Sequence, residues 1–237
     1  MITETALLKR QIRHLQIGLT ICIVLIASFV VLSFTREQRS FDVIRAKGIV
    51  IEDSTGKDRI LIGAPIPASA SRVRTDTVRA AKYWSRPYKN VEEFMKAYRS
   101  YNHNVDGIVV MNENGFDRVV VGDKLPDPNT GKKLFESAGI LFNDREGWER
   151  AGGGVNTTKE GKARAVYGLD DPDGEAVHLV TLEDGTKGLI IAGQNGMMIL
   201  GMSNKPSEWF QNKEPFSGIR YFDTNGKLLW EQKMIKK

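Results

Sequence analysis

The chain has 237 residues, of which 41% are hydrophobic and 27% charged, a balance that is typical of a folded protein and excludes global disorder. The formal net charge is +5. Three basic residues against one acid give the first 34 residues +2, which leaves +3 for the rest of the chain. So weak a positive charge does not predict nucleic acid as a partner.

An uninterrupted apolar run from Ile17 to Phe34 follows a short basic arm, residues 1–14. As a helix, this run would rise about 27 Å, close to the hydrocarbon thickness of a bilayer. We predict a transmembrane helix over 15–35, in contact with membrane lipid. A buried core helix fits less well because the run is apolar on every face and has basic flanks. A cleaved signal peptide would need a shorter run and an Ala-x-Ala-like site, which does not follow.

The basic residues on the two sides of this run are nearly balanced, so the positive-inside rule decides the orientation only weakly. We predict a single-pass protein of the bacterial inner membrane, with the N-terminus cytoplasmic and residues 36–237 periplasmic. The reverse orientation stays open. Cys22 is the single cysteine and lies within the run, so no intrachain disulfide can form.

One short unit occurs five times in residues 36–237. A Gly is followed by apolar residues, then usually Asp or Asn, two further residues, and a second Gly eight positions after the first. Asp or Asn can bond the backbone two residues on, and Gly supplies the positive φ of a type I turn with a bulge. Each unit is therefore predicted to be a β-hairpin. The predicted turn glycines are Gly56, Gly115, Gly147, Gly196 and Gly226.

A single hairpin is marginally stable in water, so the repeated units are expected to share one core. Segments such as 49–51 and 108–110 are short and β-branched, which suits burial on at least one face. Further strands are expected over 163–167 and 176–182. We predict a mainly β fold behind one transmembrane helix, arranged as a meandering barrel or as two stacked sheets.

A basic-flanked span followed by glycine-punctuated hairpin units resembles uncharacterised bacterial single-span membrane proteins. The resemblance covers the span and most of residues 46–231. It implies a protein of the bacterial envelope and carries no activity with it.

The longest connection between units is an insertion over 72–104, which begins with a basic segment and continues into a predicted helix that Asn90 can cap. Its aromatic residues either pack on the chain's own domain or form an interface with a partner. The candidate interface residues are Tyr83, Trp84, Tyr88, Phe94, Tyr98 and Tyr101.

The sequence contains none of the short motifs of nucleotide-binding, hydrolase or zinc sites, so we predict no catalytic, cofactor-binding or metal-ligating residue and no cofactor. We expect a non-enzymatic accessory or scaffold subunit of an envelope complex, which contacts a membrane protein or self-associates. A membrane-tethered binding module for a cell-wall polymer, lipid headgroup or small ligand stays open. So does an enzyme with an unrecognised site, for which His103 and Asp106 are the polar residues to inspect.

Overall fold

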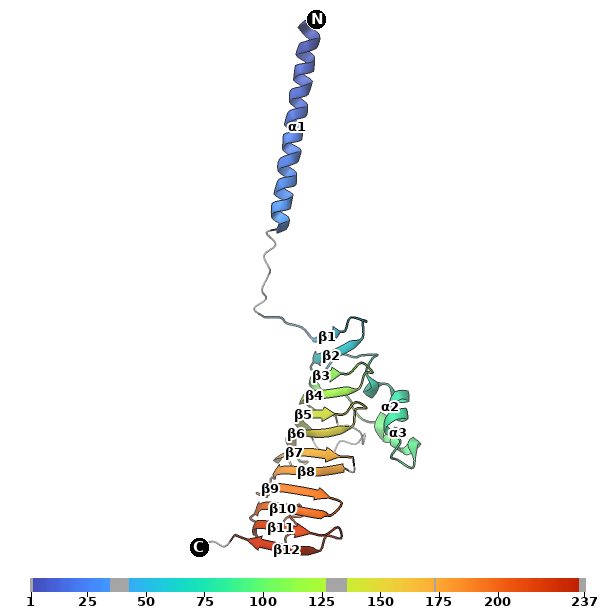
Figure 1. Cartoon of the computed structure of the whole chain (residues 1–237), viewed down its shortest axis with the longest axis vertical. Coiled ribbons are helices and arrows are strands. Elements are labelled where there is room, and N and C mark those ends of the chain that lie inside the picture. Colours follow the sequence, from blue (N-terminus) through green and yellow to red (C-terminus); the bar gives the residue numbers. More distant parts are fainter. Residues whose placement is uncertain (1, 35–42, 127–135, 173, 235–237) are drawn as a thin grey trace. The chain divides into compact units, whose positions relative to one another are not determined.

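The computed structural model describes residues 2–34, 43–126, 136–172 and 174–234, which belong to two units, Met1–Arg45 and Ala46–Lys237. In the first unit, helix α1 spans Ile2–Phe34 (Figure 1). Its segment Leu7–Val30 is long and apolar enough to cross a membrane. The helix starts within the predicted arm, residues 1–14, because the Leu, Lys, Arg and Gln residues there favour helix. Residue 35, the predicted end of the span, lies outside the described residues.

The second unit is built on one antiparallel sheet, in which twelve strands pair in chain order (Figure 1). The first six are β1 (Gly48–Glu52), β2 (Asp58–Gly63), β3 (Asp106–Met111), β4 (Asp117–Asp123), β5 (Glu136–Asn143) and β6 (Glu149–Thr157). The others are β7 (Ala163–Asp171), β8 (Gly174–Thr181), β9 (Lys187–Gly193), β10 (Gly196–Ser203), β11 (Phe216–Phe222) and β12 (Leu228–Lys233). The predicted mainly β hairpin fold is confirmed. The sheet is single and open, because each strand pairs only with its neighbours in the chain and β1 and β12 form its two edges. It is thus neither of the two arrangements predicted, a meandering barrel or two stacked sheets, because the first and last strands do not meet.

Six turns between strands share one pattern of two backbone hydrogen bonds. The N–H of the first turn residue donates to the carbonyl oxygen four residues later, and the N–H of the Gly at the fourth position donates to the carbonyl oxygen of the first residue. The six glycines have φ between 75° and 89°. They are Gly56, Gly115, Gly147, Gly161, Gly185 and Gly226. Gly161 and Gly185 were not predicted, because Thr158 and Leu182 stand where the pattern usually has Asp or Asn and Val177 stands eight residues before Gly185 in place of the first Gly. Gly196 differs, since it opens β10 after a two-residue turn and has a φ of 128°.

A row of residues that are mostly glycine crosses the whole sheet, near the strand ends that lie opposite these six turns. Each residue of the row is the cross-strand partner of the next, and we call it the glycine row. Nine of its twelve positions are Gly48, Gly63, Gly107, Gly122, Gly139, Gly154, Gly188, Gly201 and Gly218; the others are Val166, Val180 and Lys233. A Cβ on Gly139 would lie 2.1 Å from the carbonyl oxygen of Gly153. Neighbouring strands therefore meet closely here because glycine has no side chain.

Side chains beside the glycine row alternate between two faces of the sheet. On the inner face, Leu61, Val109 and Val120 form a core with residues of the connecting segments, Ile66 among them. Farther along the sheet, a second inner core contains strand residues such as Ile190 and Ile199 together with Phe210. The β2–β3 connection, through Ile66 and Val105, and the segment 204–215, through Phe210, thus each cover one part of the inner face.

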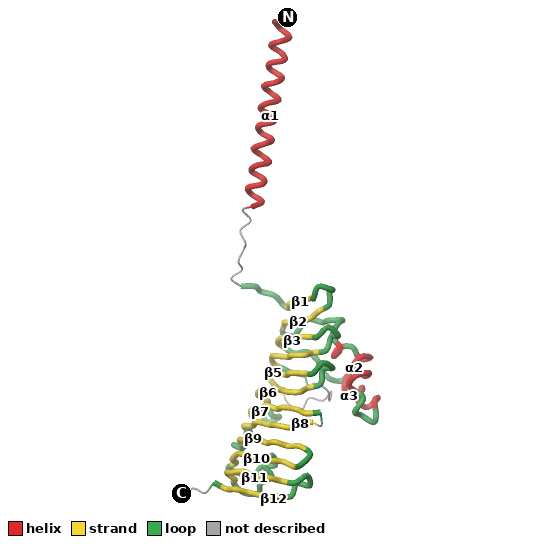
Figure 2. The backbone as a smooth tube through the Cα atoms, viewed as in Figure 1, coloured by secondary structure: helices red, strands yellow, loops and turns green. Residues whose placement is uncertain are grey.

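The insertion holds the short helices α2 (Thr77–Trp84) and α3 (Val91–Arg99), which lie to one side of the strands in Figure 2. Asp76 caps α2, and Asn90 caps α3 by accepting the N–H of Glu93. Together with the 3₁₀ turn Val73–Thr75, the helices join Phe116 of the β3–β4 connection in a third core. The predicted helical insertion is therefore present and docks on its own domain.

Arginines that follow the first three of these turns link the first four hairpins in succession. Arg59 donates from Nε to the carbonyl of Met111 at 3.0 Å, and Arg118 donates in the same way to Asn143 at 2.9 Å. Arg150 also reaches the next hairpin, and it pairs with an aspartate of its own turn at 2.8 Å. These cations are engaged within the sheet, where they connect units that would be marginal alone.

Replacing Gly139 with Ala should lower the free energy of unfolding by about 1–3 kcal/mol, because the new Cβ would overlap the backbone of the neighbouring strand. Denaturant titration of the full chain in detergent measures this. Gly193→Ala is the matched control, because a Cβ there meets nothing within 4 Å, and its effect should stay within about 0.5 kcal/mol. Equal effects of the two substitutions would contradict the steric role of the glycine row.

Candidate functional site

The outer face of the sheet carries two adjacent rows of apolar side chains, which we call the outer stripe. Each row takes one residue from every strand, and its members are successive cross-strand partners. One row is Ile49, Ile62, Ile108, Val121, Ile140, Gly153, Tyr167, Leu179, Leu189, Leu200, Ile219 and Gln232. The other is Ile51, Ile60, Val110, Val119, Phe142, Ala151, Leu169, Val177, Ile191, Met198, Tyr221 and Trp230. No charged residue belongs to the stripe.

Many side chains of the outer stripe are open to solvent. Leu179 is 60% exposed, Trp230 50% and Ile51 44%. Ile66 and Val105 of the β2–β3 connection and Phe210 of the segment 204–215 pack on the inner face, and the insertion packs on Phe116 beside a turn, so none of them covers the stripe. Monomeric soluble proteins rarely expose a contiguous apolar patch of more than a few hundred Å², and larger ones mark interaction sites. The outer stripe is therefore the leading candidate for a functional surface.

The size of the stripe follows from sheet geometry. Strands lie about 4.8 Å apart, so twelve strands make it roughly 53 Å long. Two outward residues per strand span about 13 Å along the strand direction, which gives an area on the order of 700 Å². A surface of this length and width suits another extended structure better than a small molecule.

The sequence contains a pattern that indicates an apolar outer face, although the pattern does not point to a site by itself. Segments such as 49–51, 108–110 and 119–121 are apolar at every position. In an alternating strand, such runs place apolar side chains on both faces. Which face is covered depends on where the connecting segments pack, and the sequence does not show that.

The six aromatic residues predicted as a partner interface lie in or beside the third core. Trp84, Phe94 and Tyr98 are buried in it, so in this conformation their side chains are unavailable to a partner. The other three make ring contacts within the insertion or with β-domain residues: Tyr83 with Phe116, Tyr88 with Phe94, and Tyr101 with His103. Trp84, Phe94, Tyr98 and Tyr83 thus pack with Phe116 of the chain's own domain, whereas Tyr88 and Tyr101 contact residues of the insertion and Tyr88 stays 38% exposed.

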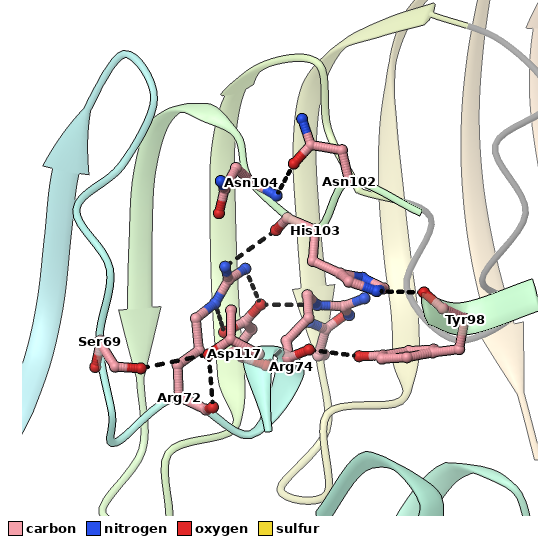
Figure 3. Close-up of polar contacts among 10 residues, drawn as sticks. Ser69, Arg72, Arg74, Tyr98, Asn102, His103, Asn104 and Asp117 are labelled. Atoms are coloured by element: carbon pink, nitrogen blue, oxygen red, sulfur yellow. Dashed lines mark hydrogen bonds and ion pairs between the residues drawn. The ribbon is translucent and has the colours of Figure 1, made fainter. Parts of the chain in front are cut away.

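Two buried arginines fix the insertion to β4 (Figure 3). Arg72 donates to both carboxylate oxygens of Asp117, at 2.9 and 2.7 Å, and Arg74 donates from Nε to Oδ2 at 3.0 Å. All three side chains are at most 1% exposed. Burial raises the pKa of Asp117, but the two guanidinium groups more than offset this effect, so its pKa lies below the ordinary value. One carboxylate is therefore shared by two guanidinium groups inside the domain.

His103 adjoins this ion network (Figure 3). Its carbonyl oxygen accepts a hydrogen bond from Arg72 at 3.0 Å, and its Nε2 lies 2.9 Å from the carbonyl oxygen of Tyr98. The imidazole stacks on the Tyr98 ring, with centroids 4.0 Å apart. Burial and the neighbouring positive charge of Arg74 lower the pKa of His103 to about 4. The ring is therefore neutral at physiological pH.

A cavity of about 410 Å³ opens on the inner face, between the parts covered by the two connecting segments. Its wall includes Gly152, Gly154 and Gly168, and glycines leave this part of the inner face without side chains. Acidic residues gather at one side: Glu149, Asp170 and Glu175, next to His178. Arg164, Asn156 and Trp209 also line it. The arrangement can accept a small ligand that carries a positive group.

The charged residues in this cavity influence one another. Burial, and then the negative charge of Glu175, raise the pKa of Asp170, while His178 and Arg150 oppose the shift. His178 lies 3.5 Å from a carboxylate oxygen of Glu175. A cationic ligand near Asp170 would relieve the repulsion between the carboxylates.

The described part of the chain contains no group of three or more His, Cys, Asp or Glu side chains that could hold a metal ion. His103 and Asp106, which the sequence offered as residues an enzyme could use, have separate partners. His103 belongs to the network around Tyr98, whereas Asp106 bonds to Lys124 Nζ at 2.8 Å.

No protein-family model, curated protein or solved structure matches the chain. Its function therefore has to be inferred from the outer stripe, the ion network and the cavity.

Replacing Asp117 with Asn should lower the free energy of unfolding by about 3–5 kcal/mol, because it leaves two buried guanidinium groups without their counter-charge. Thermal and denaturant unfolding measure the loss. Arg145→Ala is the control, because its pair with Glu113 is exposed and 3.7 Å long, and its effect should stay below about 1 kcal/mol. A mild effect of Asp117→Asn would show that the pairs do not fix the insertion.

The stability of the domain should fall as the pH drops from about 6.5 to about 4. In that range the unfolded chain binds a proton at His103 while the folded chain does not, so protonation favours unfolding. The expected loss between pH 7 and pH 5 is about 2 kcal/mol. His103→Gln should remove this part of the pH dependence, and parallel pH profiles for wild type and variant would contradict the assignment.

Proposed function

We propose that this chain is a non-enzymatic, membrane-tethered scaffold that docks onto protein through its outer stripe, as an accessory subunit of a bacterial envelope assembly. The observation that supports this proposal is an apolar face that extends over all twelve strands, while the chain's own connecting segments pack on the opposite face. A face of this kind is stable in water when something covers it.

In the proposed function, the first unit anchors the chain and the second unit docks onto protein. Segment Leu7–Val30 of α1 has the length and composition to hold the chain in a membrane. The β unit supplies a rigid surface, because its strands are tied by hydrogen bonds in fixed register and by the arginine links between hairpins. In this proposal the N-terminus is cytoplasmic and the β unit periplasmic.

Leu179→Glu tests the proposal, because it places a charge at a highly exposed position of the stripe. Purified in mild detergent from the membranes that contain it, the wild type should elute in a stable protein assembly, and the variant should lose its associated protein. Val78→Glu is the matched control, because Val78 is 78% exposed on α2, outside the stripe. Circular dichroism melting of each variant separates lost docking from lost folding.

Retention of the complete assembly by folded Leu179→Glu protein would exclude the stripe as the docking surface.

The cavity supports a second candidate function, a membrane-tethered binding module for a small ligand. A monomeric wild type that carries a small molecule in native mass spectrometry would favour that module.

A further inference from the structure

We infer that a second copy of this chain covers the outer stripe, so that two sheets pack face to face with their apolar rows between them. The inference rests on the proposed docking function and names the partner.

The length of the stripe restricts the possible partners. A protein that covers it must present an apolar surface roughly 53 Å long and only two side chains wide. A second copy presents a surface of the same length, width and twist. Two stacked sheets pack about 10 Å apart with their strands within about 30° of each other, and their side chains interdigitate.

The composition of the stripe also favours a copy of the chain. None of its 24 positions, two on each of the twelve strands, holds a charged residue, so two copies meet without repulsion between like charges. A surface that lies on a membrane usually combines apolar side chains with Lys and Arg for the headgroups. Neither row contains Lys or Arg, so a lipid surface fits the stripe less well.

The area is sufficient for a stable pair. Each copy would bury on the order of 700 Å², near the roughly 800 Å² per partner of a standard specific interface. Large apolar side chains such as Leu179, Leu200 and Trp230 stand along its length and can act as anchors. The stripe therefore has the size of one half of a standard specific interface.

The stripe is continuous even where its residues are small. On β6 its two positions are Ala151 and Gly153. The ring of Tyr167 on β7 lies over Gly153, because a Cβ there would come within 2.4 Å of the Tyr167 Cδ2 atom. The aromatic ring thus fills the gap that glycine leaves, and a partner sheet meets an unbroken apolar surface.

A membrane anchor would strengthen this association. Copies held in one membrane meet at a higher effective concentration than free domains do, so a modest contact suffices to pair them. Association of the folded copies would also stabilise the domain by mass action.

A photo-crosslinking experiment on the full chain tests the inference. Two differently tagged copies are produced in one cell, each with p-benzoylphenylalanine in place of Leu179, and irradiated in the membrane. We expect an adduct that carries both tags and has twice the chain mass of 26.5 kDa. The same probe in place of Val78 should give no such adduct, because this position lies on α2 outside the stripe. Light scattering of the unmodified chain in detergent should also give a dimeric protein mass.

The other outcomes overturn the inference in distinguishable ways. An adduct of the 179 probe with a different protein would exclude the second copy and leave the proposed docking function intact. An adduct with lipid, or no adduct from a folded and monomeric chain, would exclude both. Equal homotypic adducts from positions 179 and 78 would show unspecific contact and also exclude the paired stripe.

Discussion

The close approach of strands along the glycine row is the constraint on which the rest of this fold depends. Where Gly107 faces Gly122, a Cβ on the first would lie 1.9 Å from a carbonyl oxygen of the partner strand. Pairing shifted by one residue would place a side chain there, so glycine must face glycine along most of the row. This register in turn brings the apolar residues of all twelve strands into straight rows, half of them inward and half outward.

The inner and outer rows have similar chemistry but different surroundings. Inward residues such as Val109 and Val120 are fully buried, because the chain's own connections lie against them. These connections cover one face of the sheet and leave the other face available for docking. The buried ion pairs of Asp117 with Arg72 and Arg74 hold the insertion at the start of β4.

A scaffold role agrees with how the polar groups are used. Arg72 and Arg74 of the insertion donate to Asp117 of β4, and arginines along the sheet are bonded to neighbouring hairpins. The exception is the cavity around Gly168, where Asp170, Glu175 and His178 meet beside a bare part of the inner face. A ligand bound there would lie on the face opposite the outer stripe, so ligand binding and docking are compatible in one molecule.

The sequence by itself determined the apolar span, the hairpins and most of their turns, because these depend on local preferences of a few adjacent residues. Asp53 with Gly56, and Asn112 with Gly115, specify their turns wherever the rest of the chain lies. Only the tertiary structure decided that the hairpins join in one open sheet and that Trp84 and Tyr98 face their own domain. It also decided which face stays open. These outcomes depend on contacts between residues far apart in the chain, such as Arg72 with Asp117, and no local pattern encodes such contacts.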